Sequence, residues 1–246
     1  MENKQLIVYF LIAMILSAIS CEKEEELAYL KGTGQVTDID GNVYNTVIIG
    51  HPWLDMGEQE WMAENLRVTH YNDGSPIEFE SNSNDWHHTS AGQGLYTWYE
   101  FSYNNYGVHY GALYNGYVID NSRGLCPAGW RVPTKEEWEI LTVYLGTRTN
   151  AGGKMKSTRT AAHDSHPRWD SPNTEATNAS GFSALPAGRI DPHGNSDNLG
   201  THAFWWTSSI DDATHYYGFG AHHDQAHAGY SRFHPLSGFS VRCIKD

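Results

Sequence analysis

The chain has 246 residues, with 29 acidic side chains against 16 basic ones and a formal net charge of -13 at pH 7. Nucleic acid and anionic membrane surfaces are disfavoured as partners, because both would repel so acidic a protein. About 215 residues remain after the N-terminal segment described next, a length that suits one folded domain with a single core.

Residues 1–20 are predicted to be a lipoprotein signal peptide. Lys4 supplies positive charge, and residues 6–18 form an uncharged apolar run too short to span a bilayer comfortably. The small residues before Cys21 resemble the lipobox cleaved by the bacterial lipoprotein signal peptidase, so Cys21 is expected to carry lipid. The alternative is an ordinary free cysteine near an ordinary cleavage site. Contact with a membrane is expected only through the lipid anchor.

Residues 21–32 are predicted to be an acidic tether between the anchor and the domain. The run at 22–26 contains four glutamates and one lysine, and it resembles the surface-export signal of some bacterial lipoproteins. We therefore expect an outer-membrane, lipid-anchored protein that faces the cell exterior. Attachment facing the periplasm, or a solvated spacer with no sorting role, are the alternatives.

The domain is expected to open with β structure and to contain one well-marked helix. Runs rich in β-branched residues at 35–39 and 43–49 flank an Asp-Gly turn, which is a hairpin signal. Thr134 and Glu137 form a capping-box pattern, which predicts a helix over Lys135–Leu145. A second helix is plausible around Gly111–Ile119, with a strand as the alternative.

The C-terminal half is predicted to combine long loops with short strands. Residues beyond Gly152 are rich in Gly, Asn, Asp and Ser, which favours loops. Strand character returns in the runs 203–209, 214–221, 228–233 and 239–244. Short strands, turn residues and one or two helices together predict an α+β domain with an antiparallel sheet.

Once Cys21 is assigned to lipid, two cysteines remain, and they can pair with each other. In an exported protein an even remainder suggests a disulfide, here between Cys126 and Cys243. Two buried free thiols are the alternative.

Several segments carry a family resemblance, namely Val36–Tyr44, Trp61–Leu66, Tyr110–Asn115, Leu125–Trp138, Gly152–Lys156, Ser180–Arg189, Phe204–Ser209 and Gly238–Cys243. On these segments the chain is identified as a member of the Fibrobacter succinogenes major paralogous domain family, over residues 33–246. The resemblance implies a secreted or lipid-anchored location and a C-type-lectin-like fold, shared with formylglycine-generating enzymes, with a disulfide near the chain end. The family carries no established activity.

The resemblance does not extend to the chemistry of formylglycine-generating enzymes. Those enzymes use reactive cysteines, and pairing of Cys126 with Cys243 together with lipidation of Cys21 leaves no thiol for that reaction. No serine nucleophile elbow, phosphate-binding loop or zinc-protease helix is present. The sequence therefore supports no particular reaction, and an enzyme is disfavoured.

A histidine-rich segment is the main candidate for a metal site. His222, His223, Asp224 and His227 could hold zinc or copper on a helix, but the segment lies between two strand-like runs and fits a solvated hairpin tip better. No cofactor is expected. Calcium is a lesser alternative, because oxygen-bearing side chains occur at 173–178 and 191–198 without a fixed calcium spacing.

Three tryptophans are predicted to lie at the surface and to bind ligand, because they fall in loop-like segments and aromatic faces commonly hold sugar rings or protein side chains: Trp53, Trp86 and Trp169. The leading hypothesis is a non-catalytic recognition module at the cell surface that binds a glycan or protein ligand. A structural or assembly subunit of the cell envelope is the alternative, and a metal-dependent enzyme comes third.

Overall fold

The structure, a computed structural model, describes residues 29–51, 53, 55, 57–160 and 167–246. The predicted signal peptide and Cys21 lie outside this part of the chain. The first strand, β1, spans Leu30–Thr37, and the side chain of Tyr29 just before it is buried. The sheet therefore takes in residues 30–32, which the sequence assigned to the tether.

The first sheet joins the two ends of the described chain. Its order is β1-β2-β3-β13-β7 and its pairings are antiparallel, with β2 at Val43–Gly50, β3 at Glu58–Met62, β13 at Ile244–Lys245 and β7 at Trp130–Arg131. The predicted hairpin at its start is confirmed. The carboxylate of Asp38 accepts hydrogen bonds from the backbone N–H groups of Asp40 (3.0 Å) and Asn42 (2.9 Å), which holds the turn.

The second sheet has the order β12-β11-β10-β8-β9. Its strands are β8 at Ala187–Ile190, β9 at Ser196–Leu199, β10 at His202–Asp212, β11 at His215–His222 and β12 at Ala228–Phe233. Only the pairing of β10 with β8 is parallel. The runs predicted at 203–209, 214–221 and 228–233 are confirmed, whereas the run at 239–244 forms a strand only at its end.

A small third sheet pairs β4 (Glu78–Phe79), β5 (Leu95–Thr97) and β6 (Leu113–Tyr114). The segment predicted as a helix over Gly111–Ile119 is divided between β6 and the short helix α4 (Gly116–Ile119). The sequence allowed helix or strand there, and the chain uses both.

Five short α-helices occur in the part of the chain that the structure describes, more than the one or two expected: α2 (Ser83–His87), α3 (Val108–Tyr110), α4, α5 (Lys135–Tyr144) and α6 (Arg148–Met155). The prediction of α5 is confirmed, capping box included, since Thr134 N donates to Glu137 Oε2 (2.8 Å) and Glu137 N to Thr134 Oγ1 (3.2 Å). Two further single turns, 3-10 and π in type, occupy Tyr99–Phe101 and Tyr103–Gly107.

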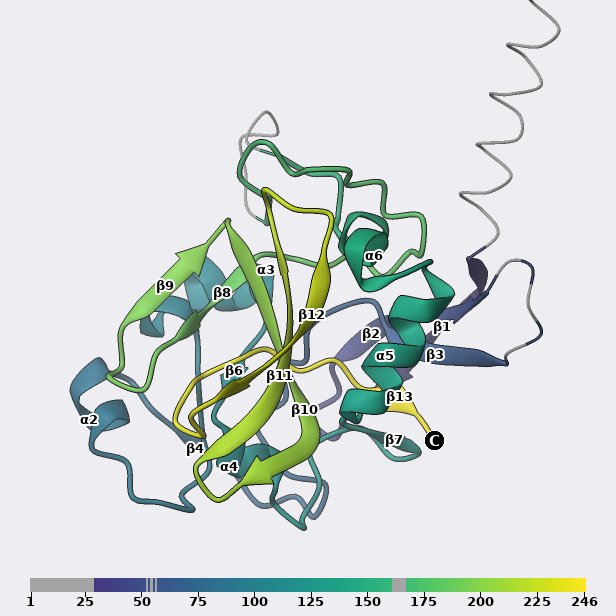
Figure 1. Cartoon of the computed structure of the whole chain (residues 1–246). Coiled ribbons are helices and arrows are strands. Elements are labelled where there is room, and N and C mark those ends of the chain that lie inside the picture. The colour runs from purple at the N-terminus through teal and green to yellow at the C-terminus, as the bar shows by residue number, and fades with distance from the viewer. Residues whose placement is uncertain (1–28, 52, 54, 56, 161–166) are drawn as a thin grey trace, which may run out of the picture.

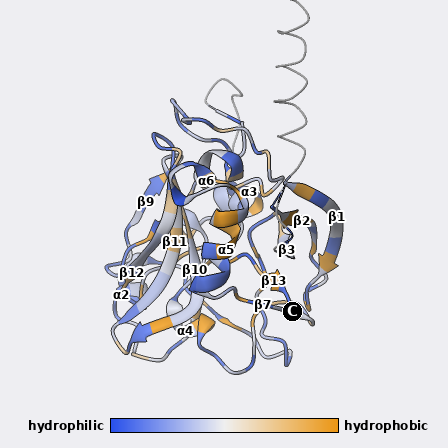
Figure 2. Ribbon diagram, turned by 45° about the vertical axis from the view of Figure 1, so that its right-hand side comes forward, coloured by the Kyte–Doolittle hydropathy of each residue, from blue (hydrophilic) through white to orange (hydrophobic). Residues whose placement is uncertain are grey.

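One of three hydrophobic clusters that make up the core of the described chain forms where α5 lies between the first two sheets, as Figure 1 shows. Trp138 on α5 is fully buried; its ring lies 4.6 Å from that of Trp61 on β3 and stacks on Phe219 of β11 at 4.4 Å, measured between ring centroids. In Figure 2 the first residues of α5 are mainly hydrophilic and its later residues mainly hydrophobic. Its buried side chains include Trp138, Leu141 and Tyr144, which share one face of the helix.

The predicted disulfide is confirmed. Cys126 and Cys243 are bonded, and both are buried in the core beside the first sheet. The bond ties the loop before β7 to the residue before β13. Within residues 29–246, gaps aside, no helix has the length and apolar character needed to cross a membrane. The architecture is thus sheet-rich, with few short helices and one disulfide.

Candidate functional site

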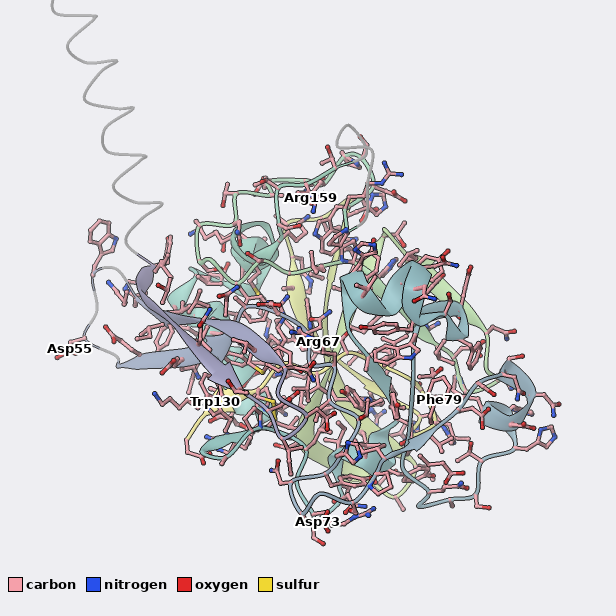
Figure 3. The ribbon with its side chains drawn as sticks, turned by 180° about the vertical axis from the view of Figure 1, so that it is seen from behind. Asp55, Arg67, Asp73, Phe79, Trp130 and Arg159 are labelled. Carbon is pink, nitrogen blue, oxygen red and sulfur yellow. A yellow bond between two sulfur atoms is a disulfide. The ribbon has the colours of Figure 1, made fainter. Side chains whose placement is uncertain are left out.

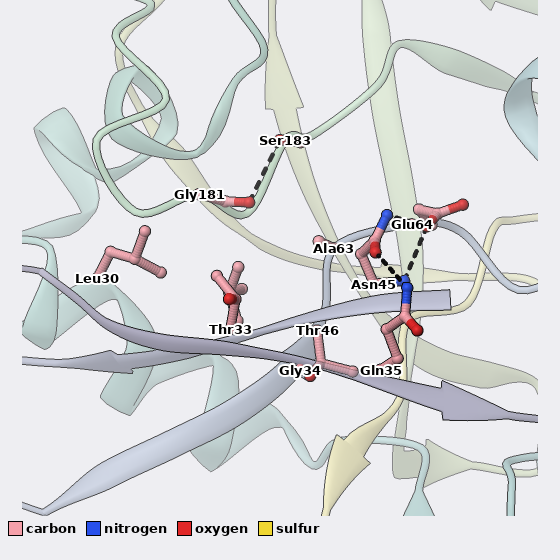
Figure 4. A pocket seen from close by; sticks show the side chains of 11 residues that line it. Leu30, Thr33, Gly34, Gln35, Asn45, Thr46, Ala63, Glu64, Gly181 and Ser183 are labelled. Carbon is pink, nitrogen blue, oxygen red and sulfur yellow. Dashed lines mark hydrogen bonds between the residues drawn. The ribbon is translucent and has the colours of Figure 1, made fainter. Parts of the chain in front are cut away.

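A hollow in the surface lies over β1 and β2 and has a volume of about 820 Å³ (Figure 4). Loop residues Gly181 and Ser183 face the strands across it. Its polar groups are largely bonded to one another, because Asn45 donates to Glu64 Oε1 through both its backbone N (2.8 Å) and its side chain (3.0 Å). No aromatic side chain is among the described residues that line it.

Another hollow, of about 150 Å³, lies on β10, β11 and β12, and we call it the glycine hollow. Its floor is made by Gly220, which pairs with Gly229 across the sheet, and by Gly218, which pairs with Ser231. The absence of side chains makes room for neighbouring rings, because a Cβ at Gly218 would lie 2.9 Å from the ring of Phe239 and one at Gly229 would lie 2.8 Å from the ring of His227. Its remaining lining residues are Phe204, His222, His227, Tyr230 and Phe233.

Histidine side chains form one side of the glycine hollow. His222 ends β11 and pairs in register with His202 on β10, and the two ring centroids lie 4.0 Å apart. The ring of His202 also stacks on Phe204, at 5.5 Å between centroids. Burial, and then the neighbouring His222, lower the pKa of His202 to about 4, and burial likewise lowers the pKa of His222. Both rings are therefore neutral at pH 7, so each offers one donor and one acceptor.

A fixed ion pair lies beside this hollow. Arg189 on β8 donates to Asp197 on β9 through Nε (2.8 Å) and Nη2 (3.1 Å), and its guanidinium lies 5.5 Å from the centroid of the Phe204 ring. Apolar rings, neutral imidazoles and the hydroxyl-bearing Ser231 together can receive a small ligand that has both an apolar face and hydroxyl groups.

The three predicted tryptophans fall in different places. Trp53 is 70% exposed, and its loop between β2 and β3 projects from the edge of the molecule, where Figure 3 labels Asp55. Trp86 and Trp169 are fully buried, so their predicted surface position is wrong. Their indole N–H groups donate inward, from Trp86 to Leu236 O (2.8 Å) and from Trp169 to Ala184 O (2.9 Å).

The reason for this error is physical. A long loop that folds against the domain must bury apolar side chains of its own, and a loop-like sequence does not show which way they point. Trp86 anchors its segment in a cluster with Leu95 and Ile190. The indole of Trp86 anchors the short helix α2 and that of Trp169 anchors its loop, and both are buried.

The metal candidates lie at a hairpin, as the sequence favoured. His222 is the last residue of β11, and His223, Asp224 and His227 belong to the connection to β12. The ring of His223 turns toward Ser171 O (3.0 Å), whereas that of His222 contacts His202. In the described ranges no three His, Cys, Asp or Glu side chains are grouped so that they could hold a metal ion.

The oxygen-rich segments considered for calcium take part in hydrogen bonds within the chain, although the buried Oδ1 of Asn173 has no partner among the described residues. The carboxylate of Asp191 accepts from the backbone N–H groups of His193 (2.8 Å) and Asn195 (2.9 Å), which makes a turn. The amide of Asn173 donates to Ser157 O at 3.0 Å.

Sequence reasoning missed Phe204, which lines the glycine hollow, and also His202 and the Arg189–Asp197 pair, which lie beside its lining residues. One signal was available. Gly218 and Gly220 stand two residues apart in a strand, which places both on one face and indicates a close approach of another group.

The described chain thus forms a sheet-rich, disulfide-bonded domain with a small hollow on one sheet. The family model described as Fibrobacter succinogenes major domain matches residues 54–245. The chain belongs to this family, a domain of unknown function, and the resemblance seen in the sequence is confirmed. Comparisons with curated proteins and with solved structures found no match.

Proposed function

We propose that this protein is a non-catalytic recognition module that binds a glycan in the glycine hollow. The observation that supports it is the lining of the hollow, which combines the aromatic rings of Tyr230 and Phe233 with the imidazoles of His222 and His227. Aromatic faces receive the apolar face of a sugar ring, while imidazoles exchange hydrogen bonds with its hydroxyl groups.

The size of the hollow limits the ligand. Pockets for drug-sized molecules measure roughly 300 to 1,000 Å³, whereas this one has about 150 Å³. The ligand group is therefore a single ring, such as a terminal sugar unit, or one side chain of a protein ligand. Affinity for one unit is expected to be weak, and binding by many copies on a surface would strengthen it.

The test is a binding screen on the soluble chain that carries Cys21→Ser, with a glycan array and a titration of simple monosaccharides followed by NMR. Ser231→Trp would fill the hollow from an exposed position on β12, and Ser208→Trp, exposed on β10 away from it, is the matched control. We expect binding to be lost in the first variant and kept in the second. A blank array together with a blank partner pull-down would count against the proposal.

We also propose that Cys21 is lipidated and that the domain is displayed on the outside of the outer membrane. The lipobox-like residues before Cys21 and the acidic run after it support this. Cys21→Ala should abolish metabolic labelling with a fatty-acid analogue. Replacing Glu24, Glu25 and Glu26 by alanine should protect the domain from protease added to intact cells, and unchanged cleavage would refute the surface-export role.

For the fold we propose the C-type-lectin-like arrangement that the family resemblance implies. Support comes from the sheet that contains both the first strand, β1, and the last, β13, and from the disulfide beside β13. An experimental structure superposed on a C-type lectin domain is the test. A common strand order in both sheets is expected, and a different order would contradict the proposal.

A further inference from the structure

Lys156, the residue after α6, is fully buried. Its ammonium Nζ lies 2.9 Å from Thr174 O, 2.9 Å from His222 O and 2.8 Å from Gln225 O. An ammonium group has three N–H donors, so each carbonyl can accept one. We call these three backbone oxygens the carbonyl cage. His223 O lies at its edge, 3.5 Å from Nζ.

The carbonyl cage is assembled from parts of the chain that are far apart in the sequence. Thr174 belongs to the loop after the cis peptide bond between Ser171 and Pro172, whereas His222 and Gln225 belong to the end of β11 and its turn. Further backbone bonds hold the same parts together, from Thr174 N to His223 O (2.7 Å) and from Gly153 N to Ala226 O (3.1 Å).

The surroundings of the ammonium are those of a bound cation. Backbone carbonyl oxygens that converge on one point are ligands that hard cations prefer, and the ring of Trp169 adds a π face 5.5 Å away. Burial lowers the pKa of Lys156 to about 8, although the nearby Asp224 and Glu175 act in the opposite direction. An isolated ammonium would be costly to bury, and the three hydrogen bonds offset that cost.

We propose that the carbonyl cage is a site for a small primary ammonium ion, and that Lys156 fills it from within the chain. Without an occupant, three buried carbonyl oxygens would face one another with no donor, which disfavours the folded arrangement of the turn. The occupied cage thereby fixes the turn from His222 to His227, which forms one side of the glycine hollow. The cation site itself does not depend on the proposed function.

The experiment uses the chain that carries Cys21→Ser, with Lys156→Ala added and n-propylammonium chloride as the probe. Alanine keeps Cβ, and propylammonium supplies the three carbons and the nitrogen that are lost. We expect saturating propylammonium to raise the thermal midpoint of the variant by about 3 to 5 °C over equal sodium chloride, with no such gain in the wild type. 1-Propanol, which has the same size but no charge, should not reproduce the effect.

Equal responses to propylammonium and 1-propanol, or no response to either, would overturn the proposal. Lys154→Ala is the matched control, because Lys154 is only partly buried and its ammonium contacts Tyr29 Oη rather than the cage. Its midpoint should not respond to propylammonium.

A second measurement needs no folded variant. In ¹⁵N-labelled wild-type protein, the protons of one lysine ammonium should exchange slowly with water at pH 6 and remain visible by NMR, because Lys156 is buried and fully hydrogen-bonded. If every lysine ammonium exchanges at the rate of an exposed side chain, the cage is not closed around a cation and the proposal fails.

Discussion

Replacing Arg242 by methionine tests whether a buried cation also holds the loop at Phe182 and Ser183. The guanidinium is fully buried, and it donates from Nε to Asn65 Oδ1 (2.9 Å), from Nη1 to Phe182 O and from Nη2 to Ser183 O (2.9 Å). Asn65 Oδ1 also accepts from Trp205 Nε1 (2.9 Å), so it keeps one partner in the variant.

The expected cost follows from the acceptors that lose their donor. Two backbone carbonyls, of Phe182 and Ser183, lose the guanidinium, at about 1 to 3 kcal/mol for each buried acceptor left unpaired. Part of this free-energy cost is offset because the variant no longer buries a charge, and replacing buried ions by apolar groups can be neutral or favourable. We therefore expect Arg242→Met to lower the free energy of unfolding by about 3 kcal/mol.

Urea unfolding followed by tryptophan fluorescence measures this change as a shift of the midpoint at unchanged slope. Arg131→Met is the control, because Arg131 is 45% exposed and its bond to Glu137 (2.6 Å) lies near the surface. Its loss is expected to cost less than about 1 kcal/mol. The reasoning is refuted if Arg242→Met unfolds at the wild-type midpoint or loses no more than the control.

Three further predictions use the same titration. Replacing both Cys126 and Cys243 by alanine should lower the free energy of unfolding by about 4 kcal/mol. The bond joins residues 117 apart, and the chain-entropy model assigns about 4 to 5 kcal/mol to a loop of this length. A urea midpoint equal to that of the wild type contradicts this prediction. Trp86→Ala should cost about 3 to 5 kcal/mol and Trp53→Ala less than about 0.5 kcal/mol, and the reverse order would show that Trp86 is not in the core. The free energy of unfolding should fall as the pH drops from 6.5 toward 4, because the unfolded chain then binds a proton at His202, whereas the folded protein, in which the pKa of His202 is lowered, does not. His202→Gln should make this fall shallower. If the free energy of unfolding depends on pH in the same way in the wild type and the variant, the effect is excluded.

Local signals account for what the sequence predicted correctly. The hairpin at Asp38 and the helix after Thr134 each depend on hydrogen bonds between residues a few positions apart. The residue types that make such bonds can be recognised directly in the sequence. The pairing of Cys126 with Cys243 followed from counting cysteines in a chain expected to be exported and from the family resemblance, and it required no geometry.

Features that depend on distant contacts could not be predicted in this way. The helix α6 contains Gly152 and Gly153. Glycine has a low helix propensity, so the sequence does not predict this helix. Both positions need glycine, because a Cβ at Gly152 would lie 2.5 Å from His227 O and one at Gly153 would lie 2.4 Å from Glu175 O. The glycine hollow likewise depends on the register of β10, β11 and β12, which no single segment shows.

The disulfide also determines how the domain would bear a mechanical load. If the chain is held at its N-terminus and pulled through a ligand at Gly220, force passes along the backbone from β1 to Cys126. From there Gly220 is about 94 residues away along the chain, but only about 23 residues back from Cys243, so the bond shortens the fully extended path from about 330 Å to about 80 Å. Even with its sheets pulled apart, the stretch between Cys126 and Gly220 would add only the shorter of these two paths to the extended length of the protein.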